Sequence, residues 1–237
     1  MEVIKASTHR HYNLVFQLIR WINAIGLIVI NIFYLSNEEN MTINNNSNSK
    51  TSHFIGLGSA GSTIAEYIFN KGIQAKYTII MESKPLNLNP AINFIEYSPK
   101  CDITQLRDMK FRIFNPKLNQ EIPKSILNVF TKDENFILIS GLSGATGTSL
   151  SKELAKWLDT RNKSFLFFGT LPFKFEGKQR ISIANDLVKT LLAKPNFHFL
   201  NLEIIREKYG NTALNQVFER ANEEIFIMIN NALNVSK

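Results

Sequence analysis

FILISGLSGATGTSL, residues 136–150, begins with five strand-forming positions and continues as a turn of small residues. Residues 152–158 then have the pattern of a helix. The backbone N–H groups of such a strand-to-helix turn point into the turn, and the helix dipole adds a favourable potential for an anion. Small side chains let phosphate oxygens reach the backbone, and the hydroxyls of Thr146, Thr148 and Ser149 can donate hydrogen bonds. The stretch predicts a phosphate-binding turn, although an ordinary tight connection has the same pattern.

The composition indicates one α/β domain with a full-sized core and an anionic ligand. The chain has 237 residues, of which 44% are hydrophobic. Its formal net charge is +7, but the Lys and Arg residues are dispersed, so the charge does not indicate a nucleic-acid partner. The single Cys101 excludes an intrachain disulfide and a thiolate-rich metal site, and it suits a reducing compartment. The four His residues have no metal-ligand spacing, so we predict no metal site in the protein itself.

Residues 1–52 differ in composition from the rest of the chain. The apolar segment 14–35 is interrupted by polar residues, and its uninterrupted part, 24–30, is short against the roughly 20 residues of a membrane-spanning helix. Basic residues precede the segment and acidic residues follow it. If the segment crossed a membrane, the positive-inside rule would place the next domain outside the cell, where it would have no nucleoside triphosphate to bind. We therefore expect an apolar segment outside the fold, a disordered Asn/Ser-rich linker up to residue 52, and a functional start near Met41. The domain over residues 53–237 is then cytoplasmic; a membrane-tethering helix over residues 14–35 is the alternative.

A second glycine-rich turn lies near the start of the predicted domain. Residues 53–55 form a strand pattern that leads into GLGSAGST, with Gly56, Gly58 and Gly61 in G-x-G-x-x-G spacing. A helical pattern follows, then a strand pattern over residues 77–81 that ends at Glu82. An acidic residue about 20 positions after the glycines completes the fingerprint of a dinucleotide-binding βαβ unit. On this pattern alone, an NAD or FAD site competes with other nucleotide sites.

The remaining chain alternates between strand and helix patterns. Strands are predicted over residues 92–97, 164–168 and 197–200, and helices near 103–109, 122–130, 150–160 and 180–192. The chain closes on an amphipathic helix over residues 211–233, with Leu214, Val217, Phe218, Ala221 and Ile225 on one face. This alternation predicts an α/β fold: a three-layer, Rossmann-like, mostly parallel sheet with helices on both faces and a long C-terminal helix. Ligands of such folds bind at the carboxyl ends of the strands.

The order of motifs over residues 53–237 resembles the nucleotide-binding domain of the tubulin/FtsZ family. IGLGSAG at residues 55–61 is similar to the family's first turn, I-G-V-G-G-A-G, and residues 141–149 are similar to its signature G-M-G-G-G-T-G-T-G. PFKFEGKQR at residues 172–180 resembles P-F-x-F-E-G-x-x-R, the most specific of the four matches. Residues 221–223, Ala-Asn-Glu, resemble the Ala-Asn-Asp of the family's central helix.

The resemblance implies a GTP or GDP site, with Mg²⁺ beside a triphosphate. The two glycine turns would hold the phosphates, Glu176 and Arg180 would contact the ribose, and Glu223 would read guanine. A carboxylate suits guanine because it accepts hydrogen bonds from both N1–H and the 2-amino group. The implied nucleotide-binding residues are Gly56, Gly58, Ser59, Ala60, Gly61, Gly141, Ser143, Gly144, Ala145, Thr146, Gly147, Thr148, Glu176, Arg180 and Glu223.

The chain also departs from the family pattern. Ser59, Ser62, Ser143, Ala145 and Ser149 replace family glycines, and each adds a Cβ that disfavours any left-handed backbone position. The family's hydrolysis-activating loop and C-terminal domain have no counterpart after residue 233, and no residue is assigned a catalytic role. Hydrolysis needs a positioned water, so we expect weak hydrolysis or none from the chain alone.

Three functions therefore remain open at the level of the sequence. The first is a guanine-nucleotide-binding domain linked to cell division or filament regulation, through self-association. The second is an NAD- or FAD-binding enzyme, or an adenylating enzyme that uses the first turn. The third is a degenerate, non-hydrolysing regulator that docks on full-length FtsZ.

Overall fold

The computed structural model describes residues 51–99, 121–132, 134–191, 195–210 and 212–235. All of them belong to one compact unit, Lys50–Lys237. The apolar segment, the linker and the helix predicted near residues 103–109 lie outside the described residues. No helix among the described residues combines the length and the apolar character that a membrane crossing requires.

Six strands form one parallel sheet in the order β3-β2-β1-β4-β5-β6. The strands are β1 (Ser52–Leu57), β2 (Lys76–Met81), β3 (Asn93–Glu96), β4 (Asn135–Gly141), β5 (Phe165–Leu171) and β6 (Phe197–Asn201). The interiors of β1 and β4 are buried on both faces, as their continuous apolar sequences require in a covered parallel sheet. The predicted α/β fold with a three-layer, Rossmann-like sheet is confirmed.

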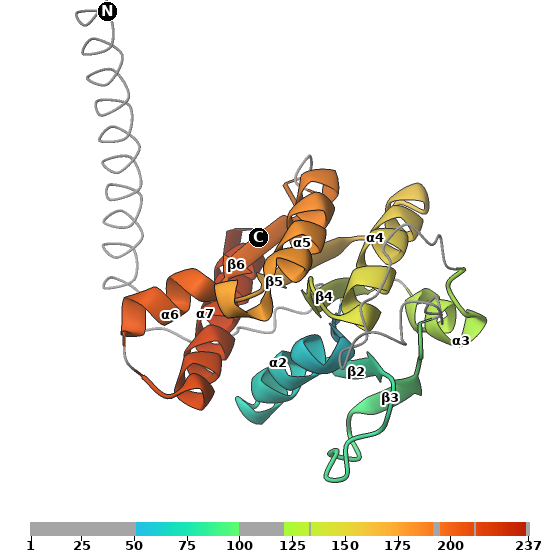
Figure 1. The fold of residues 1–237 in the computed structure, drawn as a ribbon. Coiled ribbons are helices and arrows are strands. Elements are labelled where there is room, and N and C mark those ends of the chain that lie inside the picture. Colours follow the sequence, from blue (N-terminus) through green and yellow to red (C-terminus); the bar gives the residue numbers. More distant parts are fainter. Residues whose placement is uncertain (1–50, 100–120, 133, 192–194, 211, 236–237) are drawn as a thin grey trace, which may run out of the picture. The chain divides into compact units, whose positions relative to one another are not determined.

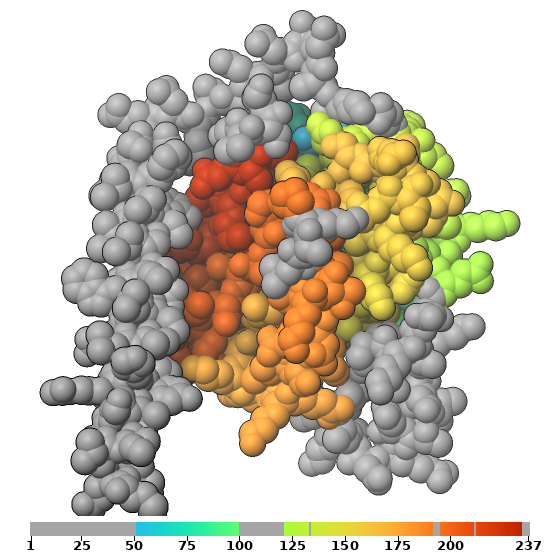
Figure 2. Space-filling view, turned by 90° about the horizontal axis from the view of Figure 1, so that it is seen from above, coloured from blue at the N-terminus to red at the C-terminus, as the bar shows by residue number. Residues whose placement is uncertain are grey.

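One face of the sheet is covered by α3 (Lys124–Leu127), α4 (Ala145–Thr160) and α5 (Lys178–Leu191). Figure 1 shows these helices on one side of the strands, and Figure 2 shows α4 and α5 lying next to each other. Leu154 and Leu158 of α4 pack with Phe136 and Leu138 of β4, all fully buried. Because a buried side chain of this size contributes roughly 1.5–3 kcal/mol, this layer holds α4 firmly on the sheet.

The other face is covered by α2 (Gly58–Asn70) and α7 (Leu214–Val235). Ile64 and Ile68 of α2 and Ile225 and Ile229 of α7 are buried against Phe54, Ile79, Ile137, Ile139 and Phe168 of the strands. The amphipathic pattern of the closing helix therefore serves this layer. The helix begins three residues after the predicted start and ends two residues after the predicted end, and a separate helix, α6 (Leu202–Tyr209), precedes it.

The sequence did not predict α6, and it placed the end of β5 too early. The strand continues through Thr170 to Leu171 because Gly169 and Thr170 pair with β4 and β6 on both sides. A Cβ at Gly169 would meet Leu142 and Phe199 at 2.9 Å, so glycine there reflects close packing and not a turn.

A buried polar network joins β1, β2 and the residue before β4 near the amino ends of these strands. His53 Nδ1 lies 2.9 Å from an oxygen of Glu134, and His53 Nε2 lies 2.9 Å from the hydroxyl of Thr78. Lys76 donates to the other oxygen of Glu134. Burial lowers the pKa of His53. Burial acts to raise the pKa of Glu134, but hydrogen bonds from Lys76 and His53 outweigh it and lower that pKa.

Both pKa shifts predict that acid destabilises the fold. Below about pH 6.5 the unfolded chain takes up a proton at His53 that the folded chain resists, and below about pH 4.5 the same holds for Glu134. The free energy of unfolding in urea should therefore be lower at about pH 5.5 than at about pH 7.5. In His53→Gln, which does not titrate, this difference should shrink. An equal pH dependence in both proteins would contradict the role of His53.

Candidate nucleotide site

The strand order reverses between β1 and β4, and the two glycine turns follow these two strands. In open parallel sheets, the crevice beyond the carboxyl ends of the strands at such a switch point is where ligands bind. The helices α2 and α4 begin there, so both helix N-termini point their free N–H groups at the same space.

The first turn brings α2 unusually close to the sheet. Gly58 begins α2 with φ +70°, a left-handed backbone that favours glycine. Gly61 lies against β4, since a Cβ at this position would fall 2.1 Å from the carbonyl oxygen of Ile139. Gly56 lies against the first turn of α2, since a Cβ at this position would fall 2.6 Å from the carbonyl oxygen of Gly61. Gly56 and Gly61 therefore position the turn through packing.

The second turn joins β4 to α4, and Gly144 is the N-cap residue of α4. The hydroxyl of Thr148 donates to the carbonyl oxygen of Leu142 at 3.2 Å, and Ser151 donates to Ser140 at 3.0 Å. A Cβ at Gly147 would fall 2.3 Å from the carbonyl oxygen of Gly141. These contacts fold the turn back on itself, while the nearest atom to a Cβ at Gly144 lies 4.0 Å away, so Gly144 faces open space.

A cavity of about 620 Å³ lies over the two turns. The turns approach each other closely, since a Cβ added at Gly58 would lie 3.3 Å from the backbone nitrogen of Gly147. The lining residues are Leu57, Gly58, Ser59, Ala60, Met81, Glu82, Ser83, Gly141, Ser143, Gly144, Ala145, Thr146, Gly147, Thr170, Pro172, Phe173, Phe175, Glu176, Arg180, Leu202, Leu214 and Phe218. The volume is within the usual range of ligand sites.

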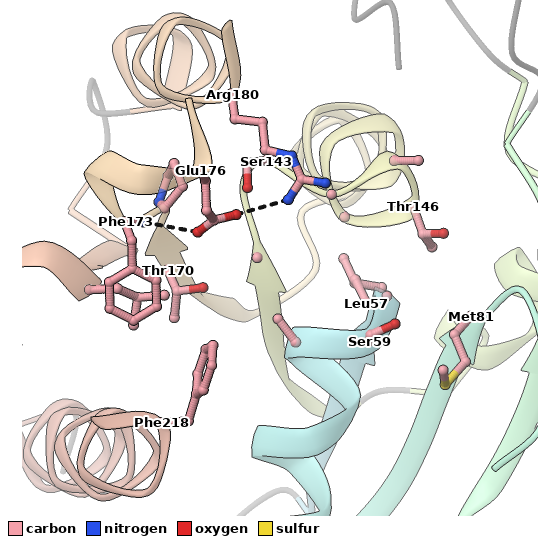
Figure 3. A pocket seen from close by; sticks show the side chains of 18 of the residues that line it. Leu57, Ser59, Met81, Ser143, Thr146, Thr170, Phe173, Glu176, Arg180 and Phe218 are labelled. Atoms are coloured by element: carbon pink, nitrogen blue, oxygen red, sulfur yellow. Dashed lines mark hydrogen bonds and ion pairs between the residues drawn. The ribbon is translucent and has the colours of Figure 1, made fainter. Parts of the chain in front are cut away.

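The segment after β5 supplies the charged wall of the cavity. Glu176 accepts from the backbone N–H of Phe173 at 2.9 Å through one oxygen and from Arg180 at 2.8 Å through the other. Figure 3 shows this pair on one side of the cavity, with Met81 and Thr146 on the opposite side. The carboxylate is thus held in one orientation and keeps free lone pairs toward the cavity.

Aromatic side chains form a further wall beside Glu176. The ring of Phe173 is buried, stacks on Phe175 at 4.9 Å and meets Phe218 of α7 edge-on at 5.4 Å. Phe175 and Phe218 are 61% and 45% exposed, which leaves ring surface open to a planar ligand. Figure 3 shows Phe173 and Phe218 on the same side of the cavity as Glu176.

Eleven of the fifteen residues named from the sequence line this cavity: Gly58, Ser59, Ala60, Gly141, Ser143, Gly144, Ala145, Thr146, Gly147, Glu176 and Arg180. Gly56, Gly61 and Thr148 are not in the lining; they pack or hydrogen-bond within the turns. Glu223 is not in the lining either, and its carboxylate pairs with Arg220 at 3.0 Å.

Sequence reasoning did not assign Phe173, Phe175, Thr170 or Phe218 to the site. Phe218 lies on the apolar stripe of α7, so the sequence pattern indicates that it packs in the core. Its place at the cavity is seen only in the structure, where its ring meets that of Phe173. The two phenylalanines of residues 172–180 could have been predicted to border a site, since a polar turn that faces only solvent seldom contains two aromatic residues.

The serine and alanine replacements do not strain the turns. Among the described non-glycine residues, only Asn162 has a positive φ, so Ser59, Ser62, Ser143, Ala145 and Ser149 adopt ordinary backbone conformations. Ser149 donates to the carbonyl oxygen of Thr146 inside α4. The expected left-handed penalty therefore does not apply to these positions.

Across the described residues, no group of three or more His, Cys, Asp or Glu side chains could hold a metal ion.

The reversed strand order and the paired glycine turns define a Rossmann-like α/β domain, and comparisons with known proteins narrow this class. No protein-family model matches the chain. Mitochondrial division protein fszB of Dictyostelium discoideum is 26% identical over 145 residues, which are 58% of this chain and 38% of that protein. Cell division protein FtsZ of Mycoplasmopsis pulmonis is 26% identical over 172 residues, 69% of this chain and 42% of that protein.

Solved structures of FtsZ and CetZ proteins have the same fold. FtsZ from M. jannaschii, an empty dimer, has a TM-score of 0.59 and 21% identity, over 75% of this chain and 52% of that one. GDP-bound CetZ1 from Haloferax volcanii has a TM-score of 0.55 and 21% identity, over 74% of this chain and 58% of that one. The chain spans about two fifths of the length of the curated relatives it matches. It contains an FtsZ-like domain with the tubulin/FtsZ fold.

Proposed function

We propose that this domain binds GTP or GDP, with the phosphates over the two glycine turns. The observation that carries the proposal is the close approach of Gly58 to Gly147, because it brings two helix N-termini under one cavity. Among the described residues of the lining, Arg180 is the one cation, so backbone N–H groups supply the favourable potential for the phosphates, with Mg²⁺ beside a triphosphate.

The base and the ribose would occupy the wall formed after β5 and by α7. Glu176 would accept from ribose hydroxyls and Arg180 would stand beside it, while the open ring of Phe218 would lie against the base. Stacking of a base on an aromatic ring contributes roughly 1–3 kcal/mol. Guanine is proposed because the CetZ1 relative is GDP-bound and because Glu223 lies on the same helix as Phe218. Reaching the base would require Glu223 to leave Arg220.

Hydrolysis by the chain alone is proposed to be weak or absent. Both oxygens of Glu176 already accept hydrogen bonds from the protein, which ties this carboxylate to Phe173 and Arg180 and disfavours a role as base for water. The domain would then act in the cytoplasm, in cell division or filament regulation. It would do so through self-association or by docking on full-length FtsZ. The FtsZ structure with the same fold is a dimer, and one of the similar sequences is a cell division protein.

The decisive test is a calorimetric titration of the full chain with GTP, GDP, ATP, ADP and NAD. We expect guanine nucleotides to bind at least about 10-fold more tightly than adenine nucleotides. Thermal unfolding in the presence of each ligand should rank them in the same order, since a ligand that binds only the folded state stabilises it.

One observation favours a second candidate, an NAD- or FAD-binding domain. Glu82 lines the cavity at the carboxyl end of β2, where dinucleotide-binding folds place the acidic residue that holds a ribose. Binding of NAD without binding of GTP or GDP in the same titration would establish this candidate and refute the first.

A further inference from the structure

The turn that carries Glu176 is held by two carboxylates from different elements. This turn includes the short 3-10 helix η3 (Lys174–Glu176). The backbone N–H of Phe173 donates to Glu176 at 2.9 Å, and the next backbone N–H, that of Lys174, donates to Glu203 at 3.0 Å. Glu203 belongs to α6, so the second contact fixes the turn to a helix outside the nucleotide loops.

Glu203 is built to hold this position. The residue is 3% exposed, and Arg206 donates to its second oxygen through both Nε and Nη2. Asn201 caps α6 by accepting from the backbone N–H of Glu203. The hydrogen bonds from Arg206 and from the Lys174 backbone lower the pKa of Glu203 to about 2, so the carboxylate is ionised at neutral pH. A buried ionised carboxylate with all these partners costs free energy to displace.

Displacement of Lys174 would move Glu176, because the two residues share one tight turn. Glu176 is also tethered to Arg180 on α5, so its orientation depends on the turn at one end and on α5 at the other. If the turn loosened, the lone pairs of Glu176 that face the cavity would lose their fixed direction. Ordered acceptors discriminate a hydroxyl from a hydrogen far better than mobile ones.

We infer that Glu203 is a positioning residue, which holds Glu176 in the orientation that recognises ribose hydroxyls and so selects ribonucleotides over deoxyribonucleotides. This inference rests on the proposed nucleotide site. Glu203 does not touch the ligand; it acts through the Lys174 N–H and the turn.

The test compares Glu203→Ala with Lys174→Ala. Lys174→Ala keeps the backbone N–H bond to Glu203 and removes only the ion pairs of the exposed ammonium, with Glu207 at 2.7 Å and with Glu203 at 3.8 Å. It is a matched control because it separates these side-chain ion pairs from the backbone hydrogen bond. Hydrogen exchange of the amides of residues 173–177 is measured in the ligand-free chain, and affinities are measured for GDP and 2′,3′-dideoxy-GDP. Glu203→Ala should speed the exchange and lower the ratio of the two affinities, each by roughly 10-fold. Lys174→Ala should change neither. In Glu203→Gln the amide oxygen can accept from the Lys174 N–H, but its NH2 then faces the Arg206 guanidinium, so this variant should give a smaller change in the same direction as Glu203→Ala.

Each other outcome has a definite meaning. Unchanged exchange in Glu203→Ala overturns the anchoring, and faster exchange with an unchanged affinity ratio overturns the positioning role. A wild-type chain that binds no guanine nucleotide overturns the proposed function instead, and the anchoring is then judged by exchange alone. If Glu203→Ala does not fold, Arg206→Met replaces it, because it removes the guanidinium that holds Glu203 and should give a smaller change in the same direction.

Discussion

Gly144→Asp should lower the affinity for GTP and GDP by at least about 100-fold and leave the fold intact. Gly144 is the N-cap of α4 with φ −82° and ψ 153°, a conformation and position that Asp favours as much as any residue. Its new carboxylate would enter the open space beside the turn, where the phosphates are proposed to lie. Two charges about 4 Å apart repel by roughly 4 kcal/mol at an effective dielectric of about 20, more than a 100-fold loss requires.

Gly144→Asn separates charge from size in this experiment. Asn is close to Asp in volume and caps a helix equally well, but it is neutral. We expect it to lose less than about 10-fold in affinity, with the same urea midpoint as Gly144→Asp. An equal loss in both variants would assign the effect to bulk, and no loss in either would show that the phosphates lie elsewhere.

Gly61→Ala should destabilise the fold by about 3 kcal/mol or more. The added methyl would fall 2.1 Å from the carbonyl oxygen of Ile139 and 2.9 Å from its carbon, and both are backbone atoms of a central strand that cannot move aside. Helix propensity acts in the opposite direction, because Ala is favoured over Gly inside a helix by about 1 kcal/mol. We expect a net decrease in the free energy of urea unfolding, because the cost of the steric clash should exceed the gain in helix propensity.

Ser59→Ala is the control for this variant, since Ser59 is an exposed residue in the same first turn of α2. Its unfolding free energy should stay within about 0.5 kcal/mol of the wild type. A Gly61→Ala protein as stable as the wild type would mean that α2 does not approach β4 as closely as described.

The glycine spacing and the apolar alternation were enough to predict the sheet and the two turns. Gly58 and Gly61 follow one buried strand, and Gly144 and Gly147 follow another. Because parallel strands end at one edge, both turns had to face the same space. The strand order, which places β1 beside β4, and the close approach of Gly58 to Gly147 come from the structure alone.

Features that depend on tertiary contacts were not predictable in this way. The sequence pattern places Phe218 on the same stripe as Val217 and Ala221, but periodicity does not tell which part of a stripe is covered. Glu203 has no motif of its own, and its role depends on an N–H of a turn 29 residues earlier. The helix α6 is a short segment of eight residues whose cap, Asn201, is also a common loop residue.

The pairing of β1 with β4 has a consequence for how the chain folds. His53 and Glu134, which meet where these strands begin, are 81 residues apart in the sequence. Closing a loop of this length costs entropy before the parallel pairing stabilises anything, and topologies dominated by such distant contacts fold slowly. Either half of the sheet can collapse earlier, but neither contains both glycine turns. The proposed capacity to bind a nucleotide is therefore expected to arise late in folding, only after the two halves of the sheet have joined.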